Sequence, residues 1–189
     1  MTHRRRQSSI DFHSALNAAA VSNDASSLSP IVEKFPSAGF LSTPSRKILL
    51  AFNGTEEAIH TLNYLKNKIL RNGDHLFIAH ILEMPADDQQ THESNLIQLK
   101  QIRDHVLENL RAISNDILHS NLHITTTLLV INHADAKIAI CRIADHHAVD
   151  LIVVGRRRRD EGGGGIPGAC STYILKQSRN PVLIVNKST

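Results

Sequence analysis

The sequence predicts an α/β fold, with an open five-stranded parallel sheet and helices on both faces. Apolar β-type runs alternate with segments of helical periodicity from Arg46 onward. Three of the runs, at Lys47–Phe52, Leu151–Val154 and Pro181–Val185, are almost continuously apolar, as in strands buried on both faces. Alternating strands and helices imply right-handed crossovers between parallel strands. With 189 residues and 41% hydrophobic content, the chain can form one real core.

The predicted elements of the domain begin with a strand at Lys47–Phe52. The turn Asn53-Gly54-Thr55 follows, and Thr55 is a suitable cap for a helix. A helix from Thr55 to Arg71 carries an apolar face, and Asn72-Gly73-Asp74 ends it. The remaining predicted elements are a strand at His75–Leu82, a long helix at His92–His119, a strand at Leu122–Val130, a helix at Ala134–His147, a strand at Leu151–Val154, a helix at Gly168–Gln177 and a strand at Pro181–Val185.

Residues 1–44 differ in composition from the domain at 45–189. They are rich in Ser, Ala, Asn and Pro, carry the basic run Arg4–Arg6, and show no lasting period. We expect a disordered basic tail there. Ser8 and Ser9 follow two arginines, as in substrates of basophilic kinases, although an unmodified tail is the simpler interpretation.

Composition argues against several classes of function. No apolar run reaches the ~18–20 residues of a membrane helix, and the net charge of +3 is too clustered for a dedicated nucleic-acid binder. Cys141 and Cys170 have no metal-like or redox-like spacing, which favours a reducing compartment, the cytoplasm or alternatively the nucleus. Adjacent histidines such as His146 and His147 point about 100° apart on a helix, so no metal site is expected. The sequence shows no recognisable catalytic constellation, so any enzymatic activity is expected to be slow.

A phosphate cradle is predicted after the fourth strand. The run Asp150–Gly155 leads into the arginine- and glycine-rich loop Arg156–Gly165, and a helix begins near Gly168. Glycine lets the backbone approach an anion, and helix N-termini attract negative charge. Turn geometry alone also explains such glycines. Because ligands of open α/β sheets lie beyond the carboxyl ends of strands, Asn53 and Gly155 are expected to face one pocket. In the same region Cys170 is interpreted as a packing residue, with a stabilised thiolate as the alternative.

Four segments resemble the universal stress protein family: Lys47–Ala58, His80–Leu82, Asp150–Gly155 and Asn180–Val185. The resemblance covers about residues 46–187. It implies a Rossmann-like sheet in the order 3-2-1-4-5, and a homodimer formed through the edge strand Pro181–Val185. It also implies a stress-response protein that binds ATP or a related adenine nucleotide in a regulatory role.

The ATP-binding members carry the signature Gly, two residues, Gly, nine residues, Gly, then Ser or Thr. On this sequence the signature starts at Gly155 and reaches Gly168 without a gap, with Arg158 at the second glycine and Ala169 at the Ser/Thr position. The resemblance implies that Ile81 and Val154 hold adenine, that Asn53 takes the ribose, and that Gly155, Arg158, Gly168, Ala169 and Ser171 surround the phosphates.

Three positions depart from the family pattern. Asn53 replaces an acidic residue and so gives up charge that would attract Mg²⁺, Arg158 replaces glycine, and Ala169 lacks a hydroxyl. The arginines Arg156–Arg159 offer side chains for phosphate in place of backbone. Two alternatives remain open: a nucleotide-free dimeric interaction module of the same fold, and a weak adenine-nucleotide hydrolase.

Overall fold

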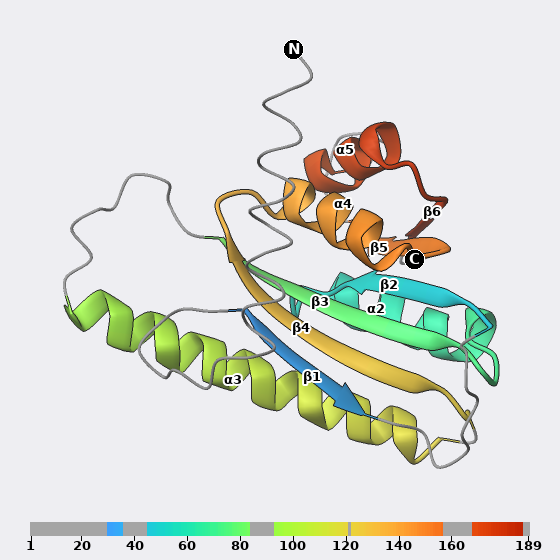
Figure 1. The fold of residues 1–189 in the computed structure, drawn as a ribbon, viewed down its shortest axis with the longest axis horizontal. Coiled ribbons are helices and arrows are strands. Elements are labelled where there is room, and N and C mark those ends of the chain that lie inside the picture. The colour runs from blue at the N-terminus through green and yellow to red at the C-terminus, as the bar shows by residue number, and fades with distance from the viewer. Residues whose placement is uncertain (1–29, 36–44, 84–92, 121, 157–167, 187–189) are drawn as a thin grey trace.

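The computed structural model describes residues 30–35, 45–83, 93–120, 122–156 and 168–186. Within these ranges the chain forms a six-stranded, mostly parallel sheet with helices on both faces (Figure 1). The predicted α/β class is confirmed. The elements are β1 (Ile31–Phe35), β2 (Lys47–Ala51), α2 (Glu56–Tyr64), the π-helical turn η1 (Leu65–Ile69), β3 (His75–Glu83), α3 (Glu93–Leu118), β4 (Thr125–His133), α4 (Ala136–His147), β5 (Leu151–Gly155), α5 (Ala169–Gln177) and β6 (Val182–Val185).

The strand order is β1-β4-β3-β2-β5-β6. Its five parallel strands, β4-β3-β2-β5-β6, follow the predicted order 3-2-1-4-5. The predicted number of strands is wrong, because β1 adds a sixth strand, antiparallel to β4. This strand lies inside the segment 1–44 that was expected to be disordered. Residues 1–29 and 36–44 of that segment lie outside the described residues.

Tertiary contacts explain why a strand forms at β1. Ile31 and Phe35 pack against the core on the face that α3 covers, while Glu33 forms an ion pair with Arg111 of α3. Ile31 pairs with Val130 of β4 in the antiparallel register. The strand thus covers the β4 edge of the parallel sheet.

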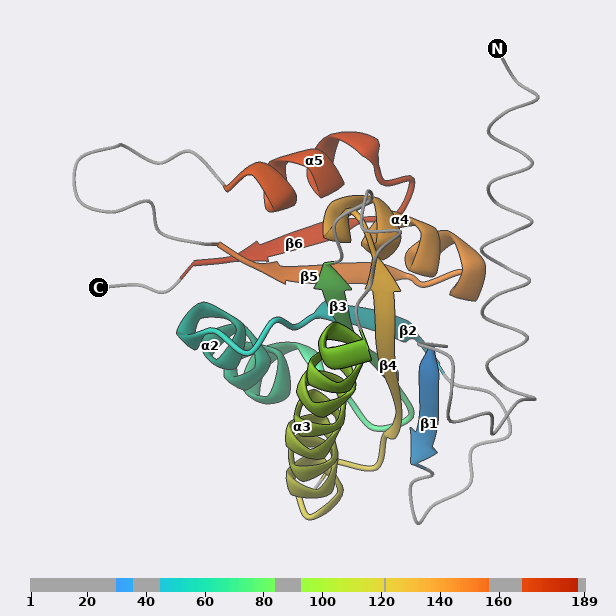
Figure 2. The ribbon, with the colours of Figure 1, turned by 90° about the vertical axis from the view of Figure 1, so that its left-hand side faces the viewer.

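Two apolar layers lie on opposite faces of the sheet. Helices α2 and α3 cover one face, and α4 and α5 cover the other (Figure 2). Alternation along β2 divides its side chains between the layers, since Ile48 and Leu50 belong to the first and Leu49 to the second. Leu110 of α3 and Ile143 of α4 are completely buried in their respective layers. The sheet is therefore buried on both faces, as its apolar runs predict.

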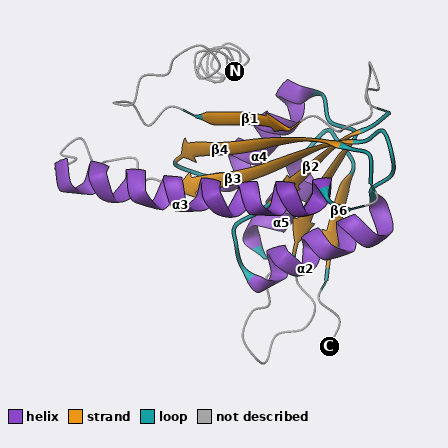
Figure 3. Cartoon of the chain, turned by 90° about the horizontal axis from the view of Figure 1, so that it is seen from below, coloured by secondary structure: helices purple, strands orange, loops and turns teal. Residues whose placement is uncertain are grey.

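The largest differences from the predicted elements lie in β4 and in the first helix. Strand β4 continues to His133 instead of ending at Val130, because residues 131–133 extend the parallel ladder with residues 81–83 of β3. The first predicted helix is divided into α2 and the turn η1, in which the Leu70 N–H donates to the Leu65 carbonyl. Figure 3 shows α3 running along β3 and β4 and extending past them at its N-terminal end.

An ion pair secures the edge of the sheet at which the parallel strands begin. The side chain of Asp74 is fully buried and accepts two hydrogen bonds from Arg46, at 3.0 and 2.6 Å. It also accepts bonds from the Ser45 hydroxyl and the Arg71 N–H. One carboxylate therefore joins the segments before β2 and before β3.

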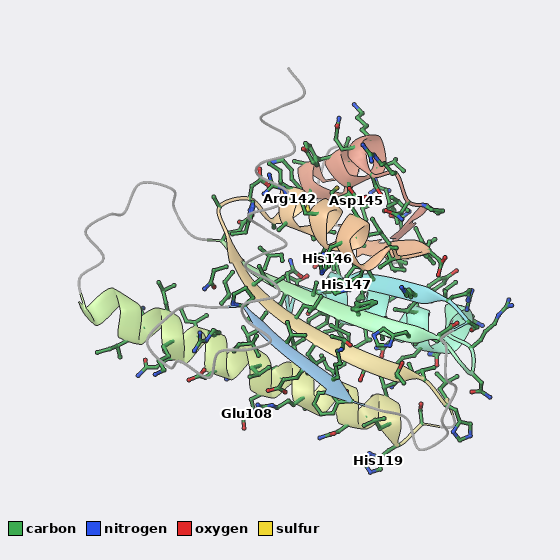
Figure 4. All side chains as sticks on the ribbon, viewed as in Figure 1. Glu108, His119, Arg142, Asp145, His146 and His147 are labelled. Carbon is green, nitrogen blue, oxygen red and sulfur yellow. The ribbon has the colours of Figure 1, made fainter. Side chains whose placement is uncertain are left out.

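Two histidines end α4 near this same edge. Figure 4 shows His146 and His147 beside the sheet, whereas the labelled His119 directly follows the C-terminal end of α3. The His147 ring stacks on Phe77 of β3, with 4.4 Å between ring centroids. Burial is the largest cause that lowers the His147 pKa to about 4, so the ring is neutral at neutral pH. In the described ranges, no group of three or more His, Cys, Asp or Glu residues is placed to hold a metal ion.

None of the helices in the described part of the chain is both long and apolar enough to cross a bilayer.

Candidate nucleotide site

A cavity of about 600 Å³ lies where β2, β3 and β5 end and where α2, α4 and α5 begin. Its volume is typical of small-molecule sites, which range over ~300–1,000 Å³. The strand order reverses between β2 and β5, because the chain builds outward from β2 in both directions. Open α/β sheets place their ligands at such a reversal.

Seven of the eight predicted site residues line this one cavity. They come from segments that are up to 118 positions apart in the sequence. The seven are Asn53, Ile81, Val154, Gly155, Gly168, Ala169 and Ser171. The eighth, Arg158, lies outside the described residues.

Asn53 organises the turn between β2 and α2. Its Oδ1 accepts hydrogen bonds from the Thr55 N–H at 3.2 Å and the Thr55 hydroxyl at 2.9 Å. Thr55 in turn caps α2, since its Oγ1 accepts from the Ala58 N–H at 3.4 Å. The side-chain oxygen of Asn53 is therefore engaged within the turn, and its amide NH₂ group is the part suited to donating to a ligand hydroxyl.

Gly155 is required for packing as well as for access to the pocket. A Cβ atom at this position would lie 2.8 Å from the Thr61 Oγ1 and 3.1 Å from the Glu57 carbonyl oxygen. Both contacts belong to α2. Glycine at the end of β5 therefore allows α2 to approach the strand closely.

The N-terminus of α5 is the most suitable anion site in the cavity. Its N-cap residue, Gly168, provides no side-chain hydrogen bond, so the N–H groups of the first turn remain available. The helices α2 and α4 differ, because Thr55 caps the first and Asp135 caps the second. The Ser171 hydroxyl donates to the Gly168 carbonyl at 3.0 Å, which leaves the backbone as the donor toward a ligand.

Ionisable residues that the sequence prediction missed also line the cavity. They are Glu57, His80, Glu83, Asp135 and Lys137. The Glu83 carboxylate accepts from the Ala136 N–H at 3.2 Å, which ties the end of β3 to the start of α4. Burial lowers the pKa of His80.

A signal for some of these residues was present in the sequence. The rule that placed Asn53 and Gly155 at strand ends applies equally to the residues that follow the third parallel strand. Asp135 and Lys137 lie in the turn after β4 and the first turn of α4, and the same rule places them at this edge of the sheet.

Cys170 occupies the first turn of α5 and lines the cavity. Although the residue is exposed overall, the pKa of its thiol is raised, first by burial and then by the Glu83 carboxylate. Lys137 offsets this only in part. The thiol is protonated at neutral pH, in contrast to the stabilised thiolate considered from the sequence.

Arg156 lies away from the cavity. Its N–H donates to the Val185 carbonyl at 2.9 Å, and its guanidinium lies 3.4 Å from the Asn186 Oδ1. It does not belong to the residues that line the pocket. Arg157–Arg159, the other members of the arginine cluster, lie outside the described residues.

The chain belongs to the universal stress protein family. The model of that family matches residues 44–186, which include the whole parallel sheet and every residue of the cavity. A curated relative, an uncharacterised protein of Schizosaccharomyces pombe, is 28% identical over 142 residues. The match covers 73% of this chain but only 23% of that much longer relative.

Solved structures of universal stress proteins share the fold. UspA from Lactobacillus plantarum superposes with a TM-score of 0.59 at 16% identity, over 76% of this chain and 99% of that one. A family member from Arabidopsis thaliana with AMP bound has a TM-score of 0.52 at 16% identity, over 76% of this chain and 93% of that one. A universal stress protein in complex with cAMP also has a TM-score of 0.52 at 16% identity, over 77% of this chain and 100% of that one.

Proposed function

We propose that this chain is a regulatory stress-response protein that binds ATP or a related adenine nucleotide in the cavity at the ends of β2, β3 and β5. The observation that carries the proposal is the meeting of Asn53, Gly155 and the uncapped start of α5 around one cavity of about 600 Å³. Family membership supports it, and two family members of known structure hold AMP and cAMP.

In the proposed complex, adenine lies against the backbone at Ile81 and Val154. The Asn53 amide donates to a ribose hydroxyl, and the phosphates face the first N–H groups of α5. Helix N-termini favour such anions through both free donors and the helix dipole. Because Asn53 is uncharged, ATP binding is expected to depend little on Mg²⁺.

Isothermal titration of the full chain with ATP tests the proposal, using Ala169→Asp as the decisive variant. An aspartate in the first turn of α5 favours the helix but occupies the anion site with negative charge. The variant is therefore expected to remain at least as stable as the wild type and to lose its binding of ATP. Ala112→Asp, an identical exchange at an exposed position of α3, is the matched control and is expected to bind ATP normally.

The outcomes separate the alternatives. No heat from a folded wild-type chain at high micromolar ATP contradicts the proposal and favours the nucleotide-free interaction module. ATP turnover that disappears in Ala169→Asp favours the hydrolase. Equal ATP affinities for Ala169→Asp and Ala112→Asp place any binding away from α5.

We also propose a homodimer in the cytoplasm, formed through the predicted segment Pro181–Val185, whose strand β6 is an edge of the sheet. The carbonyls of Pro181 and Val185 bond to β5, so the N–H groups of Val182 and Ile184 point toward the open edge. Ile184→Pro removes one outward N–H without removing a bond to β5. Light scattering is expected to show a dimer for the wild type and for Ile184→Ala, and a monomer for Ile184→Pro. A dimeric Ile184→Pro variant contradicts pairing through β6.

A further inference from the structure

Lys137 is the one cationic side chain among the described residues that line the cavity. The other charged lining residues are the carboxylates Glu57, Glu83 and Asp135. The described wall is therefore acidic on balance, and an anionic ligand finds positive potential in two places, the start of α5 and the Lys137 ammonium.

The Lys137 ammonium lies close to the start of α5. Lys137 is the second residue of α4, and its Nζ lies 5.4 Å from the centroid of the Tyr173 ring. Tyr173 is four residues after Ala169, a rise of about 6 Å along α5. Aromatic side chains on helices lean toward the N-terminus, which brings the ring and the ammonium above it back toward the first turn.

Asp135 holds this ammonium in a way that permits release. Its Oδ1 accepts from the Lys137 N–H at 3.1 Å and caps α4, while its Oδ2 accepts from the Lys137 Nζ at 2.7 Å. A ligand that takes over the Nζ contact leaves the cap intact. The two side chains are 35% and 29% exposed, so an incoming ligand can reach both.

Both groups carry their charge at neutral pH. The hydrogen bond between them, the largest contribution for each, raises the pKa of Lys137 and lowers the pKa of Asp135. Exchange of the carboxylate for a phosphate therefore keeps the ammonium in a charge-assisted hydrogen bond.

We infer that Lys137 is a specificity residue of this cavity. Its ammonium gives up the contact with Asp135 and binds a ligand phosphate instead, and the cavity therefore favours adenine nucleotides in proportion to their negative charge. The inference rests on the proposed nucleotide site. It differs from the signature of the family, which runs from Gly155 to Ala169, because it assigns phosphate selection to the start of α4.

Titration of the full chain with adenosine, AMP and ATP tests the inference. Lys137→Gln is expected to weaken ATP binding about tenfold, which is the effect of one partly exposed charge-assisted contact. It is expected to change the affinity for adenosine by less than about twofold. Lys137→Arg keeps the charge and is expected to retain ATP within about threefold. Asp135→Asn keeps a good N-cap but removes the competing charge, so it is expected to tighten ATP about two- to fivefold.

Each outcome decides between the proposals. If Lys137→Gln leaves the ATP affinity within twofold of wild type, or weakens adenosine binding as much as ATP binding, the inference about Lys137 is wrong while the proposed nucleotide site stands. If Asp135→Asn weakens ATP in a protein that keeps its circular dichroism spectrum, competition between carboxylate and phosphate is wrong. A wild-type chain that binds none of the three ligands contradicts the proposed function itself.

Discussion

Replacing Gly155 with alanine tests whether the end of β5 is shaped by packing against α2. The added Cβ would lie 2.8 Å from the Thr61 Oγ1, 3.1 Å from the Glu57 carbonyl oxygen and 3.3 Å from its carbonyl carbon. All three distances are shorter than ordinary van der Waals contacts between heavy atoms of these kinds. Two of the atoms belong to the backbone of α2, so the helix must move.

The expected cost is that of overpacking a dense interior. Such insertions destabilise proteins by about 1–3 kcal/mol, and we expect about 2 kcal/mol here because rigid backbone receives part of the clash. The shift would also displace the first turn of α2, which carries Glu57 into the cavity wall. Weaker ligand binding is therefore expected alongside the loss of stability.

A double-mutant cycle with Thr61→Ala isolates the contact. Thr61 is fully buried, and its hydroxyl donates to the Glu57 carbonyl at 2.6 Å. Thr61→Ala alone is expected to cost about 1–2 kcal/mol through the lost hydrogen bond and the cavity. In the Gly155→Ala background it also removes the closest clash, so the double variant is expected to cost about 1 kcal/mol less than the sum of the two.

Urea unfolding followed by circular dichroism measures the four free energies of the cycle, provided that each variant unfolds in two states with an unchanged slope. A Gly155→Ala protein within about 0.5 kcal/mol of wild type would show that α2 does not depend on this glycine. Strict additivity in the cycle would show that the cost arises somewhere other than Thr61.

Three further substitutions test other parts of the structure. Asp74→Asn is expected to lower the unfolding free energy by about 3 kcal/mol, because it leaves Arg46 without its buried carboxylate; the exposed Asp116→Asn, which removes a surface ion pair, should cost less than about 1 kcal/mol in the same urea titration. His147→Phe is expected to flatten the dependence of stability on pH. The unfolded chain binds a proton at this ring near pH 6.5 and the folded chain only near pH 4, so the stability of the wild type falls as the pH is lowered from about 6.5 to about 4. An equally steep fall in the variant contradicts the assignment. Asn53→Asp preserves the acceptor of the turn, so unfolding should change by less than about 0.5 kcal/mol, whereas ATP titrations should become dependent on Mg²⁺; equal affinities with and without the metal ion contradict that role.

The parallel part of the fold was predictable because local patterns and chain topology agree. Apolar runs located the buried strands, and alternation with helices implied a parallel sheet. The family resemblance then supplied the order of the strands. Both kinds of signal are contained in short segments of sequence.

The sixth strand was not predictable by the same means. Ile31–Phe35 is a five-residue run in a polar, Pro-containing segment, and its stability depends on distant contacts. Glu33 pairs with Arg111, 78 residues later, and the backbone pairs with β4, about 95 residues later. A strand that is stabilised by such distant partners leaves little trace in the local sequence.

The candidate site was predictable in part for a similar reason. Asn53 follows a strand, Gly155 is the last residue of a strand and Gly168 caps a helix, and the family signature and its neighbouring motifs identified all three. Lys137 was missed because its position near the start of α5 is visible only in its contact with Tyr173, which belongs to another helix. Only the folded chain brings that ammonium to the start of α5.

Chemical-shift perturbation with ATP on the isotope-labelled full chain tests whether the nucleotide binds at the ends of β2, β3 and β5. We expect the largest shifts at the amides of Ala169, Cys170 and Ser171, with smaller ones at Gly155 and Ile81, and little change around Asp74 at the opposite edge of the sheet. Saturable shifts confined to that opposite edge, or no shifts at millimolar ATP, would contradict a nucleotide site at the ends of β2, β3 and β5.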